Sequence, residues 1–224
     1  MSKTQKKLLF LALFTLLGFG SLQVPFNKLA GSNVSFTLFD FFAPIAGAFL
    51  GPVFGIASVF TVEIVNNLIK QTPWTTGSII RLFPILFATY YFATIQKQGR
   101  RNWILAVPIL SIIIFLAHPN GRQVPHYPLM FWLIPLIAYR FKNNLYMRGL
   151  GATFTAHSVG GAAWIWAFNL KPVVWQGLIP VVISERLLFA AGIAVSYLVI
   201  KHVLGFLARK KILPTLETHA VSQS

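Results

Sequence analysis

The sequence predicts an all-α fold, a polytopic membrane helix bundle, and three observations lead to this class. Hydrophobic residues occupy 56% of the 224 positions and charged residues only 10%, whereas a soluble domain carries about 25% charge. The apolar residues gather into runs close to the ~20 residues that cross a bilayer, and the basic residues lie between these runs. We therefore expect a multi-pass protein of the cell membrane, with one transmembrane domain over 1–208 and a polar cytoplasmic tail over 209–224.

Six to eight transmembrane helices fit the chain, and eight is the best count. The apolar runs are 8–24, 36–50, 52–69, 77–95, 103–117, 127–139, 149–169 and 176–207. The second, fifth and sixth runs are short for a ~30 Å hydrocarbon core, so one of them could be re-entrant or tilted. The first run follows Lys3, Lys6 and Lys7, which also fits a signal peptide. The lack of a convincing cleavage site favours an uncleaved helix.

The distribution of basic residues supports eight spans with both termini in the cytoplasm. With the N-terminus inside, thirteen basic residues fall in cytoplasmic segments and four in outer loops, in agreement with the positive-inside rule. The inner residues are Lys3, Lys6, Lys7, Lys97, Arg100, Arg101, Arg140, Lys142, Arg148, Lys201, Arg209, Lys210 and Lys211. The outer residues are Lys28, Lys70, Arg122 and Lys171. Arg81 and Arg186 fall within the predicted spans.

The segment 36–69 is predicted to form a helical hairpin that lines a polar pocket. Its two apolar runs meet at Gly51-Pro52, and each contains one acidic residue, Asp40 or Glu63. A charge at membrane depth costs roughly 2.5–3.5 kcal/mol on insertion scales and usually faces a partner or water. Small residues at four-residue spacing predict that the two helices approach closely. These residues are Ala43, Gly47, Gly51 and Gly55.

Five polar residues are expected in the outer half of the bundle and form the predicted substrate site: Asp40, Glu63, Asn66, Asn67 and Arg81. One arginine can pair closely with one carboxylate. We therefore predict that Arg81 holds one of the two carboxylates. The other, with Asn66 or Asn67, would bind a neutral or cationic small molecule in a cavity roofed by the loop 118–126.

A second group lies near mid-membrane and allows two interpretations. Glu185 and Arg186 are neighbours about 100° apart on a helix, so each is expected to reach a different helix, either as a clamp or as a coupling or substrate contact. His157 and Trp164 share one helix face with Gly161. A membrane histidine of this kind is either a hydrogen-bonded strut or a ligand, and we include His157 and Trp164 among the predicted substrate-binding residues.

The tryptophans also allow two interpretations. Five of the six fall towards the predicted outer face: Trp74, Trp132, Trp164, Trp166 and Trp175. They fit an interfacial aromatic belt or the lining of an outward-facing ligand cavity.

The sequence contains no motif for catalysis, a cofactor or a metal. It has no GxxxxGK[ST] phosphate loop, no HExxH pair and no GxSxG elbow. The absence of cysteine excludes thiolate chemistry, and the five histidines are scattered. The net charge of +15 is explained by topology, so we expect no nucleic-acid partner. The prediction is a non-enzymatic membrane protein without a cofactor.

The stretch VSFTLFDFFAPIAGAFLGPVFGIASVF resembles the early helices of the substrate-binding S components of energy-coupling factor (ECF) vitamin transporters. In both, an apolar helix leads through a G-P-x-x-G turn, here Gly51, Pro52 and Gly55, into the next helix. The likeness is specific over about 35 residues. The S components usually have six spans and often dock through Ala-xxx-Ala in the first helix, whereas the first span here offers Ala12, Gly18 and Gly20 without that spacing.

The resemblance implies capture of a vitamin-like small molecule from outside, with import driven by a separate transmembrane scaffold subunit and ATPase subunits. Two other functions remain open from the residues alone. In a cell-envelope scaffold protein the charges would only clamp helices. In a stand-alone secondary transporter Glu63 and Glu185 would be proton-linked carboxylates.

Overall fold

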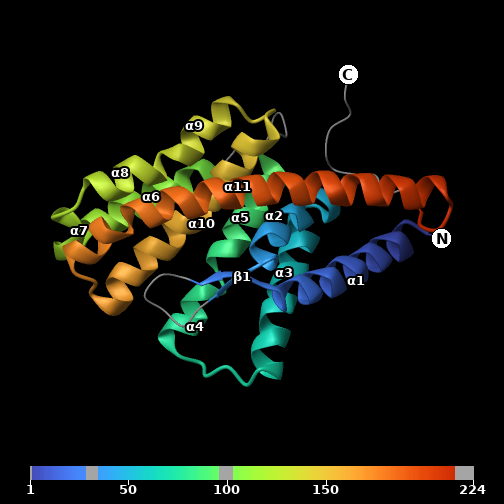
Figure 1. Cartoon of the computed structure of the whole chain (residues 1–224), viewed down its shortest axis with the longest axis horizontal. Helices are drawn as coiled ribbons and strands as arrows, with labels where there is room; N and C mark the ends of the chain where they lie inside the picture. Colours follow the sequence, from blue (N-terminus) through green and yellow to red (C-terminus); the bar gives the residue numbers. More distant parts are fainter. Residues whose placement is uncertain (1, 29–34, 96–102, 215–224) are drawn as a thin grey trace.

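The computed structural model describes residues 2–28, 35–95 and 103–214, and this part of the chain is almost entirely helical (Figure 1). The all-α class is confirmed. The basic residues Lys97, Arg100 and Arg101 and the tail beyond 214 lie outside the described residues. The elements in order are α1 (Lys3–Leu22), β1 (Pro25–Lys28), β2 (Ser35–Thr37), α2 (Phe39–Leu50), α3 (Pro52–Ile69), α4 (Thr76–Arg81), α5 (Pro84–Thr94), η1 (Trp103–Leu105), α6 (Ala106–Ala117), α7 (Pro119–Arg122), α8 (His126–Trp132), α9 (Ile134–Arg140), α10 (Leu145–Phe168) and α11 (Pro172–Arg209).

Four helical segments are long and apolar enough to cross a membrane: Thr4–Leu22, Pro52–Ile69, Thr76–Thr94 and Pro172–Arg209. Two further apolar helices are shorter, Phe39–Leu50 and Trp103–Ala117, and both coincide with runs that the sequence marks as short. A helix occurs at each of the eight predicted positions, but length and composition support membrane crossing for these four.

Proline explains why two predicted spans are divided. Pro84 opens α5 directly after α4 has ended, and Pro135 lies at the start of α9 just after α8. Proline lacks a backbone N–H and is accommodated in the first turn of a helix rather than in its interior. The predicted spans 77–95 and 127–139 are therefore each two helices in sequence.

The hairpin of α2 and α3 forms as the glycine pattern predicts. Gly51 links the helices with a positive φ of 83°, and Pro52 opens α3. A Cβ built on Gly55 would lie 2.6 Å from the Gly47 nitrogen, and one on Gly47 would lie 2.6 Å from the Thr89 carbonyl oxygen of α5. Only glycine permits backbones this close, so α2 is held tightly between α3 and α5.

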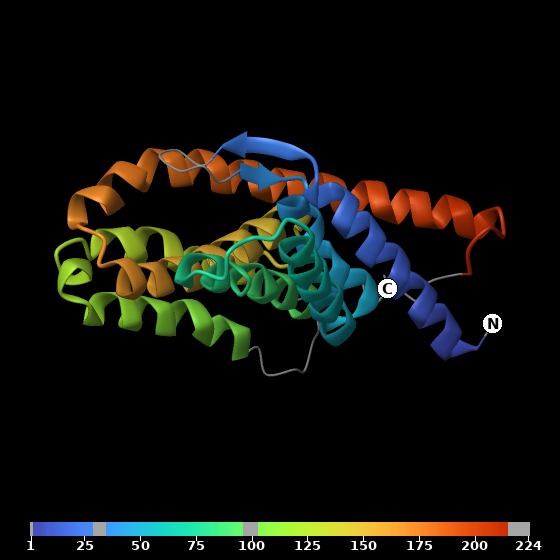
Figure 2. The same ribbon diagram turned by 90° about the horizontal axis from the view of Figure 1, so that it is seen from below.

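A short antiparallel pair of strands follows α1, and the sequence did not predict it. β1 pairs with β2, and Leu38 N donates to Val24 O at 3.0 Å. The pair lies alongside α11, where the Phe36 and Phe189 rings meet edge to face with centroids 4.7 Å apart (Figure 2). The strands thus bring the start of α2 against the middle of α11.

Helix α10 separates two apolar cores. One core is built from α1, α2, α3 and α5, the other from α6 and α8, and α11 contributes to both. α10 also contributes to both, with Ala152 and Ala156 in the first and Phe154 and Ile165 in the second. Most residues of its first half are buried. The polar side chains of α10 therefore face the interior of the bundle, where the candidate site lies.

The beginning of α10 contains a buried cation that was expected in a cytoplasmic loop. Arg148 is only 3% exposed, and its guanidinium carbon lies 3.9 Å from the Phe92 ring centroid and 5.3 Å from that of Tyr197. The helix starts four residues earlier than predicted, at Leu145. Aromatic rings on α5 and α11 then accept the guanidinium through cation–π contacts.

Candidate functional site

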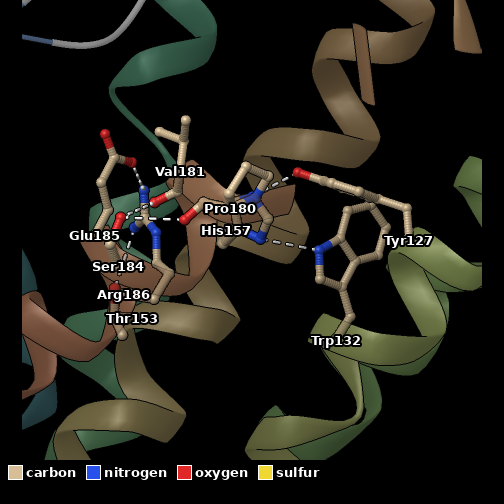
Figure 3. Close-up of polar contacts among 9 residues, drawn as sticks. All are labelled: Tyr127, Trp132, Thr153, His157, Pro180, Val181, Ser184, Glu185 and Arg186. Atoms are coloured by element: carbon tan, nitrogen blue, oxygen red, sulfur yellow. Dashed lines mark hydrogen bonds and ion pairs between the residues drawn. The ribbon is translucent and has the colours of Figure 1, made fainter. Parts of the chain in front are cut away.

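His157 is fixed at both ring nitrogens (Figure 3). Trp132 Nε1 and His157 Nδ1 are 3.1 Å apart, and Tyr127 OH and His157 Nε2 are also 3.1 Å apart. An indole N–H can only donate, so Nδ1 accepts and the neutral ring carries its proton on Nε2. The Nε2–H then donates to the Tyr127 oxygen. We call Tyr127, Trp132 and His157 the histidine network.

Aromatic packing surrounds this network. The imidazole centroid lies 5.9–6.1 Å from the rings of Tyr127, Phe131, Trp132 and Phe154. Trp132 and Tyr127 are fully buried. Both nitrogens of His157 are already occupied, so the geometry favours the hydrogen-bonded strut over the ligand interpretation of this residue.

Arg186 joins α11 to α10. Its Nη1 donates to Thr153 Oγ1 at 3.1 Å (Figure 3). Thr153 precedes His157 by one helical turn, so the same face of α10 holds both contacts. The guanidinium also lies 4.8 Å from the Phe189 ring and 5.7 Å from the Phe36 ring. Its Nε is buried and has no hydrogen-bond partner among the described residues.

Glu185 remains beside Arg186 and does not reach another helix through a hydrogen bond in the described part of the chain. The shortest distance between the two charged groups is 3.9 Å, from Arg186 Nη2 to Glu185 Oε2, which is long for a hydrogen bond. The expectation of two different helix partners therefore holds for Arg186 alone. Glu185 is 6% exposed and keeps unused acceptor capacity.

Asp40 lies at the start of α2 and connects the two predicted groups of charges. Its Oδ2 accepts from Thr37 N at 2.9 Å. The carboxylate interacts electrostatically with Arg186 and with Arg81, and Glu63 interacts with Asp40 and Arg81. The outer and mid-membrane groups thus form one set, which we call the charged cluster: Asp40, Glu63, Arg81, Glu185 and Arg186.

The predicted close pairing of Arg81 with a carboxylate is not found. Arg81 ends α4 and is exposed, and among the described residues the one ion pair joins Glu185 to Arg186. The position of Arg81 at the surface explains the difference, because its charge can be hydrated there. Glu63 nevertheless interacts electrostatically with Asp40.

The two asparagines are placed differently from each other. Asn66 is buried, and its Oδ1 accepts from Gln23 Nε2 at 3.1 Å, so it joins α3 to the end of α1. The half-buried Asn67 side chain has no hydrogen bond among the described residues, although its carbonyl oxygen accepts from Thr72 N. Asn66 therefore has a structural partner, and Asn67 stays available.

None of the described contacts of Trp164 or of the loop 118–126 is with Asp40. The Trp164 ring packs at a tilt of 33° against Phe168, with centroids 4.5 Å apart. The loop folds into α7 and contacts the end of α10, where Asn120 Nδ2 donates to Asn169 Oδ1 at 2.9 Å. The described contacts of the loop include none with Asp40 or Glu63, so it does not form the predicted roof.

The tryptophans divide between the two interpretations. Trp74, Trp103 and Trp166 are about half exposed, as in an aromatic belt, whereas Trp132 and Trp175 are buried in the core.

The sequence did not predict the roles of Thr153 and Tyr127 or the hydrogen bond of Trp132. The spacing of Thr153 and His157 by one helical turn was the available signal.

The arrangement offers hydrogen-bond acceptors and donors inside an apolar bundle. No group of three or more histidine or acidic residues in the described chain could hold a metal ion. Two buried polar atoms have no hydrogen-bond partner among the described residues: Thr37 Oγ1 and Arg186 Nε. Thr37 contacts Asp40, and Arg186 contacts Phe36.

Comparison with known proteins found no matching family model, curated protein or solved structure.

Proposed function

We propose that this chain is a membrane-embedded substrate-capture subunit that binds a small vitamin-like molecule from the outer face of the cell membrane. The observation that carries the proposal is the charged cluster around Asp40. Ionisable residues within membrane segments are costly and are commonly retained for a function. The resemblance of 34–60 to ECF S components supports the same reading, with a scaffold subunit and ATPases as partners for import.

The charge of the cluster favours a cationic or neutral ligand. It contains three carboxylates and two guanidinium groups, and the neutral tautomer of His157 adds no charge. One negative charge therefore remains to be balanced by a ligand, a proton or water. The unused oxygens of Asp40, Glu63 and Glu185 would accept hydrogen bonds, and the Arg186 Nε–H would donate one.

Native mass spectrometry of the purified protein tests whether a small molecule co-purifies. We expect a bound species whose identity then defines the substrate for uptake assays. If none is retained under conditions that preserve the fold, and cells lacking the protein import vitamins normally, the capture function is wrong. A scaffold function would then account for the Arg186–Thr153 contact.

A matched pair of variants separates binding from folding. Asp40→Asn should weaken binding of the identified ligand by about 1.5–3 kcal/mol, the worth of a hydrogen bond to a charged group, with thermal stability nearly unchanged. Asn66→Ala is the control, because it breaks the contact with Gln23 and should lower stability without changing affinity. Equal affinity for wild type and Asp40→Asn, measured by calorimetry, would remove Asp40 from the site.

A further inference from the structure

An apolar groove lies between α5, α6 and α10, and its lining includes no residue of the charged cluster. Its volume is ≈ 490 Å³, and Phe87, Leu110, Ile114, Val159 and Trp166 are among the residues that line it. Leu110 is 55% exposed and Ile114 47%, so the groove opens to the outside of the bundle. In a membrane protein this surface faces the hydrocarbon chains of the lipids.

Small residues and one tryptophan give the groove a defined shape. Ala162 and Ala163 contribute its α10 side, where larger side chains would fill the space. Trp166 Nε1 donates to Ile114 O at 2.9 Å, which fixes the indole across α6 and α10. The groove follows α6 from Val107 to Ile114, or about 10 Å at 1.5 Å per residue.

A cation lies just past the Trp166 end of the groove. Arg122 Nε donates to Leu116 O and its Nη2 to Ala117 O, both at 3.1 Å. These carbonyls come two and three residues after Ile114. Arg122 is exposed and forms no ion pair with a carboxylate in the described part of the chain. Its charge is therefore available beside the groove.

We propose that this groove binds one acyl chain of an anionic phospholipid whose phosphate lies against Arg122. A phospholipid carries its charge at the interface and its chains directly beneath, and the groove has the same order: Arg122, then the Trp166 indole, then an apolar channel. Tryptophan prefers this interfacial depth. The single basic residue supplies the preference for an anionic headgroup.

Quenching of tryptophan fluorescence by brominated acyl chains tests the proposal. The protein is placed in phosphatidylcholine nanodiscs with a minor fraction of dibrominated phosphatidylglycerol or, separately, dibrominated phosphatidylcholine. We expect stronger quenching by the anionic lipid at equal mole fraction, and Trp166→Phe should abolish the difference. Equal quenching by the two lipids in the wild type would overturn the proposal.

Three further variants test the two halves of the site. Arg122→Gln should reduce the preference for the anionic lipid by about fivefold, the effect of one basic residue near an anionic surface, while Arg122→Lys should retain it. Ala163→Phe should lower quenching by both lipids because it fills the groove. Ala57→Phe is the control, since Ala57 lines a separate groove of ≈ 520 Å³ between α1 and α3. The site would be contradicted if Arg122→Lys lost the preference for the anionic lipid. It would also be contradicted if Ala57→Phe lowered quenching as much as Ala163→Phe.

Discussion

At the scale of single residues, the histidine network predicts a specific loss of stability. Trp132→Phe removes the N–H that Nδ1 of His157 accepts and leaves a buried acceptor unsatisfied, which costs about 1–3 kcal/mol. We expect a lower free energy of unfolding in detergent. Trp103→Phe is the control, because its Nε1 hydrogen bond to Tyr90 is exposed, and it should change stability by no more than about 0.5 kcal/mol. Similar losses in both variants would show that the network contributes nothing.

Arg148 permits a prediction about which of two replacements gives the more stable protein. No carboxylate pairs with it among the described residues, and its Nε is buried without a partner. Arg148→Met removes this buried charge but keeps an apolar chain of similar reach, and replacing buried charges by hydrophobic residues is often neutral or stabilising. Arg148→Lys keeps the charge and loses the planar stacking on Phe92. The thermal unfolding temperature of Arg148→Met should therefore be higher than that of Arg148→Lys. The reverse order would reveal an unseen counter-ion.

At the scale of secondary-structure elements, the crossing of α2 with α3 and α5 predicts which glycines can be replaced. Gly55→Ala would place a methyl group against the Gly47 backbone, and such overpacking costs typically about 1–3 kcal/mol. Gly20→Ala is the matched control in α1, since no described atom outside its own helix turn lies within 4 Å of its Cβ position, and it should be neutral or stabilise by up to ~1 kcal/mol. Chemical denaturation in detergent measures both. A stable Gly55→Ala protein would mean that the two helices separate easily.

The helices and strands also show which parts of the fold can be predicted from sequence patterns. Apolar runs and the Gly51-Pro52 turn predicted the positions of α2 and α3, because both signals are local. The β1–β2 pair was missed, and α11, 38 residues or about 57 Å, begins four residues before and ends two residues after the predicted run 176–207. Helix ends depend on tertiary contacts such as Arg148 with Phe92, and strands of four and three residues carry too little periodicity to predict.

At the scale of the whole molecule, the sequence predicted which residues are unusual better than it predicted their partners. Asp40, Glu63, Glu185 and Arg186 stood out because charges are rare in apolar runs. Depth along each run could not show that Asp40 lies near Arg186, because that proximity depends on how α2 packs against α11. The prediction for Arg81 failed for the same reason, as the chain turns it to the surface at the end of α4.

The arrangement of the helices also bears on the membrane topology. Hydrogen bonds join Thr15 to Ser58 and Gln23 to Asn66, both 43 positions apart, so α1 and α3 run in the same direction. Trp166 of α10 bonds to Ile114 of α6, and Asn120 of α7 bonds to Asn169 just after α10. The C-terminal ends of α6 and α10 therefore lie together, so these two helices also run in the same direction. The beginning of α1 and the end of α11 lie at one end of the molecule (Figures 1 and 2). A bundle of eight alternating spans requires that α1 run parallel to α3, that α6 run parallel to α10, and that both ends of the chain lie on one side.

Reporter fusions test this topology directly. With both termini in the cytoplasm, fusions at Lys28, Gly99, Arg122, Asn143 and the C-terminus should report outside, inside, outside, inside and inside. Relocating basic residues from one loop to another should not change the outside report of the Lys28 fusion. The reason is that hydrogen bonds of Asn66 and Ser58 hold α3 against α1. A six-span chain in which the short α2 and another short helix do not cross would place Lys28 and Lys70 on opposite sides. That outcome would conflict with the parallel packing of α1 and α3, and a C-terminus outside would exclude an even number of spans beginning inside.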